Sequence, residues 1–87
     1  MVWKIEISDQ ARKQARKLSK ADADRITRSL QEIAALEDPR QRGHGLVGHY
    51  AVYWRYRVGD YRIIAKIEDG RLVVIVIAIG HRREEYR

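Results

Sequence analysis

The feature that most constrains the fold of this chain is an unbroken apolar run near its C-terminal end, from Leu72 to Ile79. A strand with one face in water alternates apolar and polar residues, whereas a strand buried on both faces is apolar throughout. The run is far shorter than the roughly 20 apolar residues that a membrane-spanning helix needs. It therefore predicts a central strand of a sheet, covered on both faces.

Two turn signals before this run divide the C-terminal half of the chain into a meander of three strands. Gly59-Asp60 separates an alternating stretch, residues 52–58, from a second strand, residues 61–68. Asp69-Gly70 then precedes the apolar run, and such a pair strongly favours a type I′ hairpin turn. Residues 38–49, which contain the single proline and three of the glycines, predict an irregular surface loop.

The N-terminal half predicts one strand followed by two helices. Residues 2–7 alternate as a half-buried strand does, and Ser8 can cap a short helix with apolar residues at 11, 15 and 18. Ser19 and Asp22 have the spacing of a capping box for a second helix, whose apolar stripe falls at 23, 26, 30 and 33. This helix should end before Pro39, because the residue preceding proline avoids the α region.

Together these elements predict a single α+β domain over residues 1–87, in the order strand-helix-helix-strand-strand-strand. We expect an antiparallel two-helix hairpin packed on a twisted, mainly antiparallel four-stranded sheet. The chain has no cysteine, so it has neither a disulfide nor a thiolate metal site. The first ten residues carry charges where a secretory signal would be apolar, and we expect a cytoplasmic protein that does not bind membranes.

Positive charge is concentrated in the second half of the chain. The net charge is +6: residues 1–39 carry eight Lys and Arg against seven Asp and Glu, and residues 40–87 carry ten against five. A basic half of this kind suits a polyanionic partner, either nucleic acid or an acidic protein. The alternative is that these charges only keep a small domain in solution.

Strand geometry is expected to gather several arginines on one face of the sheet. If Gly59-Asp60 is a two-residue loop, Arg57 lies opposite Arg62 and Arg55 lies opposite Ile64. Alternation then assigns seven residues to the core face: Trp54, Tyr56, Val58, Tyr61, Ile63, Ala65 and Ile67. Four share the opposite face: Tyr53, Arg55, Arg57 and Arg62.

Folding alone gives no reason for this arginine cluster. Like charges directly opposed on neighbouring strands destabilise a sheet by roughly 0.2–1 kcal/mol. A bound phosphate chain supplies a reason, because arginine pairs with phosphate through two parallel hydrogen bonds. The alternative is an ordinary surface network in which Glu68, Glu84 or Glu85 neutralises the cluster.

The segment after the apolar run, residues 81–87, adds further candidates. Arg82 directly follows the strand end and Tyr86 lies a few residues later, so either side chain can fold over the arginine cluster. A tyrosine suits an unstacked base beside a phosphate, although Tyr86 can equally close the edge of the core. The three histidines lack metal-ligand spacing and no phosphate-binding glycine loop is present, so we expect neither metal nor cofactor.

At this point the sequence resembles a known family. The stretches WRYRVGDYRII (residues 54–64) and GHRREEYR (residues 80–87) are similar to two signature stretches of the RelE/ParE toxin superfamily, and most similar to its RelE branch. The resemblance covers essentially the whole chain, and the N-terminal helices are its least specific part. It implies a toxin held in a hetero-oligomeric complex by an antitoxin. For the RelE branch it implies a metal-independent endoribonuclease that cuts mRNA in the ribosomal A site, by attack of a 2′-OH on the adjacent phosphate.

The resemblance also implies roles for individual residues. Arg62 would hold the scissile phosphate, and Arg82 would stabilise the transition state or protonate the leaving oxygen. Tyr86 would orient the substrate and is one candidate to take the 2′-OH proton. Arg55 occupies a basic catalytic position on the preceding strand. The remaining candidates would bind RNA or phosphate: Arg57, Tyr53, His81 and Arg83.

One departure from the RelE pattern leaves the general base unidentified. That pattern has a pair of lysines where this chain has Tyr53 and Arg55. A lysine with a lowered pKa can act as a base, but an arginine essentially cannot. Electrostatic stabilisation of the transition state does not depend on which group is the base.

Two alternatives share the expected fold. A ParE-like toxin would bind and inhibit DNA gyrase without cutting RNA, and a non-catalytic module would only bind RNA. Fold cannot separate them, whereas the combination of Arg55, Arg62, Arg82 and Tyr86 is needed only by a nuclease. In either toxin, the basic face suits an acidic, partly disordered RelB-like antitoxin, bound as a helix in a groove or as a strand added to the sheet edge.

Overall fold

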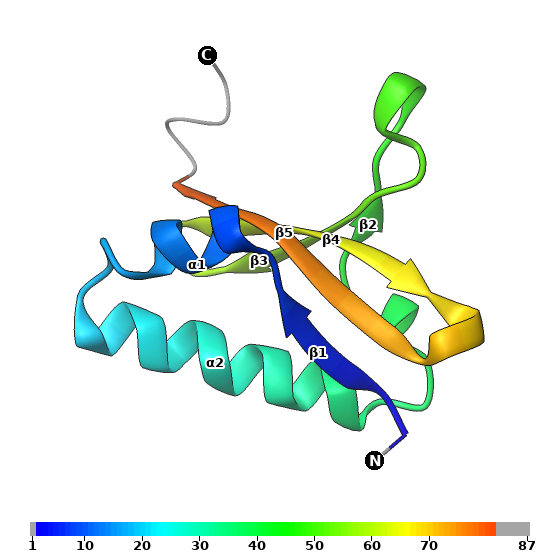
Figure 1. The fold of residues 1–87 in the computed structure, drawn as a ribbon, viewed down its shortest axis with the longest axis horizontal. Helices are drawn as coiled ribbons and strands as arrows, with labels where there is room; N and C mark the ends of the chain where they lie inside the picture. The colour runs from blue at the N-terminus through cyan, green and yellow to red at the C-terminus, as the bar shows by residue number, and fades with distance from the viewer. Residues whose placement is uncertain (1, 82–87) are drawn as a thin grey trace.

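The computed structural model describes residues 2–81, apart from the side chain of Tyr50. Seven regular elements follow one another along this part of the chain (Figure 1): β1 (Lys4–Ile7), α1 (Asp9–Ala15), α2 (Lys20–Ala35), β2 (His44–Gly45), β3 (Trp54–Val58), β4 (Tyr61–Glu68) and β5 (Val73–His81). Single turns of 3-10 helix lie in the connections, at Pro39–Gln41, Gly48–Tyr50 and Asp69–Arg71. Neither helix has the length and apolar composition of a membrane span.

The strands form one mixed sheet in the order β1-β5-β4-β3-β2, with β1 parallel to β5 and the other neighbours antiparallel. The expected four-stranded sheet is wrong by one strand. The fifth strand, β2, lies in the segment predicted to be an irregular loop and pairs His44 with Arg55 and Gly45 with Trp54. Two residues are too few to display a period of two, so the sequence pattern carries no signal for this strand.

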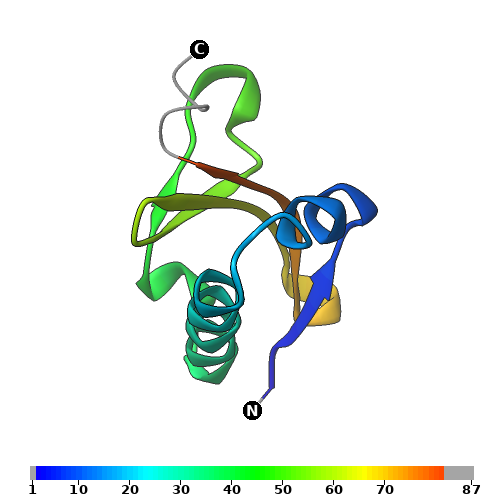
Figure 2. The same ribbon diagram turned by 90° about the vertical axis from the view of Figure 1, so that its left-hand side faces the viewer.

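Both helices begin where the caps predict and pack on the same face of the sheet. The Ser8 side chain accepts a hydrogen bond from the Ala11 amide, and the Ser19 side chain accepts one from the Asp22 amide. The chain runs one way through α1 and returns through the longer α2, which Figure 2 shows end-on beside the sheet. One buried core joins residues of both helices to the facing strands: Ala11, Ile26, Leu30, Ile33, Tyr56, Ile63, Val74 and Val76.

The hairpin of β3 and β4 has the register that the Gly59-Asp60 turn predicts. Val58 pairs with Tyr61, Arg57 with Arg62 and Arg55 with Ile64. Gly59 has a φ of +59°, which favours glycine. The seven residues expected on the core face are buried or pack against the core, so this assignment is confirmed.

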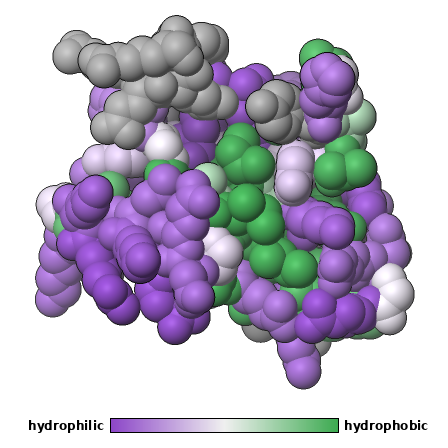
Figure 3. Space-filling view, turned by 45° about the horizontal axis from the view of Figure 1, so that its top comes forward, coloured by the Kyte–Doolittle hydropathy of each residue, from purple (hydrophilic) through white to green (hydrophobic). Residues whose placement is uncertain are grey.

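Strand β5 is central, as predicted, but the expected cover on both faces is absent from the described part of the chain. The helices pack on one face only, and Ile75, Ile77 and Ala78 are half-buried on β5. Figure 3 shows apolar side chains reaching the surface in a band between polar regions. The all-apolar run thus identified an interior strand, flanked by β1 and β4, but not a second covering layer.

The connection before β5 also differs from the expected type I′ turn. Glu68 pairs with Val73, so the loop comprises residues 69–72, and Leu72 has a φ of +53° instead of belonging to the strand. Arg71 fastens this loop by donating to Glu68 at 2.8 Å and to Glu6 at 3.0 Å. The hairpin itself was predicted correctly, and the error concerns its loop length.

Residues 37–42, which we call the pinned corner, are anchored by three aromatic side chains. Trp3 Nε1 donates to the Glu37 carbonyl at 3.1 Å, the Tyr56 hydroxyl to the Pro39 carbonyl at 2.8 Å, and Trp54 Nε1 to the Arg42 carbonyl at 2.6 Å. The expected irregular loop is therefore an ordered segment over part of its length. The bonds hold the end of α2 and the approach to β2 against the sheet.

Candidate functional site

Strands β2, β3 and β4 gather a cluster of basic side chains on the sheet face opposite the helices. It consists of His44, Arg55, Arg57 and Arg62, and we call it the arginine face. Alternation along β3 directs Arg55 and Arg57 away from the core that Tyr56 and Val58 join. Pairing then brings Arg62 opposite Arg57 and His44 opposite Arg55.

The exposure of the three arginines differs. Arg57 is exposed, Arg55 is half-buried, and Arg62 is only 3% exposed, the one charged residue buried among residues 2–81. A guanidinium keeps its proton in proteins, so its burial is costly unless other groups compensate its charge. An arginine that serves only solubility stays in water, and Arg62 does not.

A cavity of about 210 Å³ lies between β2 and β3 on this face, lined by His44, Arg55 and Arg57. Gly43, with a φ of +80°, brings the backbone close to β3, and a Cβ there would clash with the Arg55 carbonyl. This approach fixes His44 beside the arginines. Sequence reasoning assigned His44 to a solvated loop, because the two-residue strand that places it leaves no periodic signal.

Two of the predicted site residues lie elsewhere. Tyr53 precedes β3 and lines a separate cavity of about 170 Å³ with Arg40, Val52 and Trp54 among its other residues. His81 pairs with Tyr61, a residue that packs against the core, and their rings meet edge to face with centroids 5.3 Å apart. The structure therefore brings together Arg55, Arg57 and Arg62, but neither Tyr53 nor His81. Arg82, Arg83 and Tyr86 lie outside the described residues.

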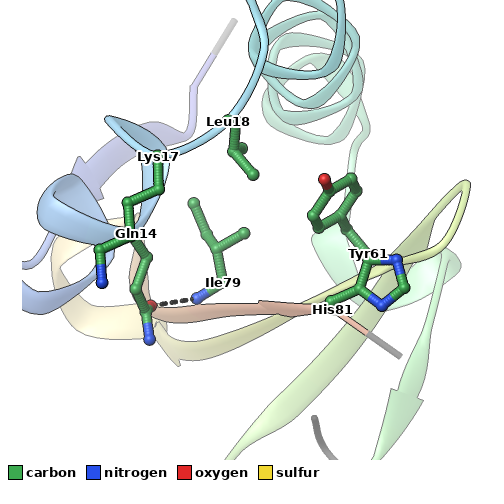
Figure 4. Close-up of a pocket in the computed structure, with 6 residues that line it drawn as sticks. All are labelled: Gln14, Lys17, Leu18, Tyr61, Ile79 and His81. Carbon is green, nitrogen blue, oxygen red and sulfur yellow. Dashed lines mark hydrogen bonds between the residues drawn. The ribbon is translucent and has the colours of Figure 1, made fainter. Parts of the chain in front are cut away.

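His81 belongs to a different hollow at the end of the sheet (Figure 4). This cavity of about 310 Å³ is lined by Gln14, Lys17, Leu18, Tyr61, Ile79 and His81. The Gln14 side chain accepts a hydrogen bond from the Ile79 amide at 2.6 Å, and the Tyr61 hydroxyl donates to Asp22 at 3.1 Å. Contacts from both helices thus fix the strand end that carries His81.

The site offers electrostatic and proton-transfer chemistry. Among residues 2–81 no group of three or more histidine, aspartate or glutamate side chains is arranged to hold a metal ion. The arginine face supplies guanidinium groups that match phosphate oxygens, and His44 supplies an imidazole with a ring nitrogen that can accept a proton. This combination suits a phosphodiester that is held by charge while a proton is moved.

Comparisons with known proteins agree with this geometry. A family model described as the ParE toxin of type II toxin–antitoxin systems, parDE, matches residues 5–86. The mRNA interferase toxin RelE of Escherichia coli K12 is 30% identical over 83 residues, which cover 94% of this chain and 85% of that protein.

Solved structures of RelE proteins have the same fold. The archaeal RelE–RelB complex from Pyrococcus horikoshii OT3 superimposes with a TM-score of 0.77 at 25% identity, covering 94% of this chain and 97% of the other. The isolated E. coli RelE toxin gives a TM-score of 0.75 at 25% identity, covering 91% and 83%. The chain therefore belongs to the RelE/ParE superfamily of toxins of type II toxin–antitoxin systems.

Proposed function

We propose that this toxin is a metal-independent endoribonuclease that cuts mRNA on the ribosome and is neutralised by a cognate acidic antitoxin. The E. coli relative at 30% identity is named an mRNA interferase, which favours the nuclease over a ParE-like inhibitor of DNA gyrase. A toxin that acts on translating ribosomes works in the cytoplasm, which agrees with the expectation from the sequence.

The observation that carries the proposal is the direct opposition of Arg57 and Arg62, with Arg55 on the same face. Like charges on directly paired strands repel each other. A phosphodiester bound between the strands would turn the repulsion into attraction. Phosphoryl chemistry also gains from fixed cations, because charge on the phosphate oxygens grows in the transition state.

In the proposed reaction the 2′-oxygen of one nucleotide attacks its own 3′-phosphate. The bond from phosphorus to the 5′-oxygen of the next nucleotide breaks, which leaves a 2′,3′-cyclic phosphate and a 5′-OH. Arg62 holds the non-bridging oxygens, and Arg55 and Arg57 align the strand. Positioning supplies much of the rate enhancement, since the ribosome already orders the mRNA.

The C-terminal candidates keep their proposed roles in this scheme. Arg82 stabilises the charge of the transition state, Tyr86 orients the nucleotide, and Arg83 binds phosphate. Arg82 follows His81 at the end of β5, whose Gly80 pairs with Arg62. The backbone at residue 80 thus begins this segment beside the arginine face.

The antitoxin we propose is an acidic segment that covers this face. The half-buried Ile64, Ile75 and Ile77 lie on the two central strands, and Arg55 and Arg57 lie on the next strand along. Apolar surface beside cations suits an amphipathic segment with acidic residues along one side. The RelE of P. horikoshii was solved in complex with a partner named RelB.

A translating bacterial extract tests the activity directly. After addition of the purified toxin, primer extension maps new 5′ ends along a reporter mRNA. We expect breaks phased with the codons, and loss of at least about 100-fold in cleavage rate for Arg62→Ala, the scale for removing one transition-state charge contact. Arg28→Ala removes the same charge from an exposed position on α2 and is the matched control.

Other outcomes would assign a different function. Intact mRNA together with accumulated gyrase–DNA breaks would establish the ParE-like inhibitor. Intact mRNA, no gyrase breaks and salt-sensitive binding of RNA would leave the non-catalytic module. Equal cleavage by Arg62→Ala and the parent toxin would remove the arginine face from the site.

A further inference from the structure

We infer that His44 is the general base that takes the proton of the attacking 2′-OH, an assignment that rests on the proposed nuclease function. The RelE pattern has a pair of lysines where this chain has Tyr53 and Arg55, and an arginine cannot take up this role. Among residues 2–81, the arginine face contains one side chain with a ring nitrogen that can accept a proton, and that side chain is His44.

The position of His44 follows from strand pairing and from the cavity. His44 pairs directly with Arg55, and directly paired residues direct their side chains to the same side of the sheet. The next residue confirms the orientation, because a Cβ on Gly45 would contact the Trp54 ring on the core side. His44 also lines the 210 Å³ cavity together with Arg55 and Arg57.

The strand spacing leaves room for the substrate between His44 and Arg62. β2 and β4 flank β3, so their backbones lie about 10 Å apart at the usual separation of roughly 4.8 Å between neighbours. In this arrangement the phosphate lies over β3 and is bound by Arg62 of β4 and by Arg55 of β3. The ribose that carries the 2′-OH then faces β2. The imidazole can then reach the 2′-OH within hydrogen-bonding distance, which a general base requires.

The proton balance of the step is simple. A ring nitrogen of neutral His44 accepts the 2′-OH proton while the 2′-oxygen bonds to phosphorus. The bond to the 5′-oxygen breaks, the departing 5′-oxygen takes a proton from solvent, and the imidazolium returns its proton to solvent. The charged groups that face His44 across the cavity are Arg55 and Arg57, both on β3, and neither loses its proton near neutral pH.

The test is single-turnover cleavage of an mRNA positioned on ribosomes, with toxin in excess, measured from pH 5 to pH 8.5. We expect His44→Gln and His44→Ala to lower the maximal rate about 100-fold or more, the usual scale for a general base, with little change in the toxin concentration at half-maximal rate. The parent rate should rise with pH, because only the neutral imidazole can accept the 2′-OH proton, and both variants should lose that rise.

His49→Ala is the matched control, because His49 is an exposed histidine a few residues away that does not line the cavity. It should stay within about twofold of the parent at every pH. Added imidazole should restore part of the His44→Ala rate and leave His44→Gln unchanged, since only alanine opens a space for it. A merely structural role for His44 would not produce rescue.

The outcomes separate this assignment from the proposed function. If the parent toxin cuts mRNA and His44→Ala cuts within about threefold of it with the same pH profile, the assignment is overturned and the nuclease stands. If the parent toxin leaves the mRNA intact, the nuclease proposal and the assignment both fall. If His44→Ala is slow, loses the rise with pH and recovers with imidazole, His44 is the base.

Discussion

The pinned corner and the arginine face both depend on side chains of strand β3, which they use in opposite ways. Trp54 and Tyr56 point inward and donate hydrogen bonds to carbonyls of residues 42 and 39, so polar groups there are satisfied. Arg55 and Arg57 point outward, and Arg57 directly opposes Arg62. Alternation along five residues thus separates a region that stabilises the fold from one that costs stability.

The comparison implies that the two faces of β3 respond differently to substitution. Substitution of an inward-facing residue of β3 should lower the stability of the protein and affect its activity only through unfolding. Substitution of an outward-facing residue should lower the activity and leave the stability unchanged or slightly higher. This division is what a strained functional site on a well-anchored scaffold predicts.

The largest effect is expected on the inward side, for Tyr56→Ala. The Tyr56 side chain is buried, with 2% of its surface exposed, and belongs to the hydrophobic core. Truncation of a large buried aromatic ring usually costs about 3–5 kcal/mol in the free energy of unfolding. Urea titration followed by circular dichroism measures the loss. A change below about 1 kcal/mol would mean that the corner does not anchor the sheet.

A smaller effect is expected for Tyr56→Phe, which keeps the ring and removes only the hydroxyl. The Pro39 carbonyl would lose its 2.8 Å hydrogen bond in a buried site, at a cost of about 1–3 kcal/mol.

The parent and the Tyr56→Phe variant should also differ in stability at alkaline pH. Burial raises the pKa of Tyr56 above the ordinary value of 10.0, so above pH 10 the phenol ionises in the unfolded chain before it does so in the folded protein. The parent should therefore lose stability as pH rises beyond 10. Tyr56→Phe has no phenol at this position, so its stability should fall less over the same pH range.

On the outward side, Arg57→Ala should have the opposite sign. Removal of Arg57 relieves its repulsion with Arg62, so the free energy of unfolding should rise by up to roughly 0.2–1 kcal/mol while cleavage slows. Thermal melting at low and high salt checks the cause, because screening should shrink the gain. Arg28→Ala provides the baseline for loss of one exposed positive charge. A variant that is both less stable and less active would contradict the division between the two faces.

The same division explains how much was predictable from the sequence. The Gly59-Asp60 turn made the register of β3 and β4 predictable, and with it the position of Arg57 opposite Arg62. With a two-residue turn, only one pairing of these strands places their apolar residues on the core face. The caps at Ser8 and Ser19 were predictable for a similar reason, since a local side chain satisfies a local amide.

Features that depend on distant backbone groups were not predictable in this way. The Trp54 indole donates to the carbonyl of Arg42, and a carbonyl acceptor is present at every residue, so no side-chain pattern identifies it. His44 joins the arginine face only through pairing of a two-residue strand with β3. His81 lies with Tyr61 because the register of β4 and β5 includes an irregularity between Ile64 and Ala65, which the sequence does not mark.

The smallest effect concerns an ion pair that ties the pinned corner to the loop before β5. Arg40 donates to both carboxylate oxygens of Asp69, at 3.0 and 2.8 Å, and this hydrogen bonding lowers the pKa of Asp69 from its ordinary value of 3.8. A carboxyl whose pKa is lower in the folded state contributes stability above the unfolded value, and the contribution disappears as pH falls through the folded value. Asp69→Asn should therefore reduce stability slightly at pH 6, and the difference from the parent should shrink as pH falls below 3.8 and vanish once the folded carboxyl is protonated. Melting temperatures of both proteins across this range measure it, with Asp9→Asn on α1 as the control. An Asp69→Asn curve parallel to that of the parent at every pH would show that this bidentate contact adds nothing to the corner, which the aromatic hydrogen bonds and the ion pair of Arg42 with Glu32 would hold without it.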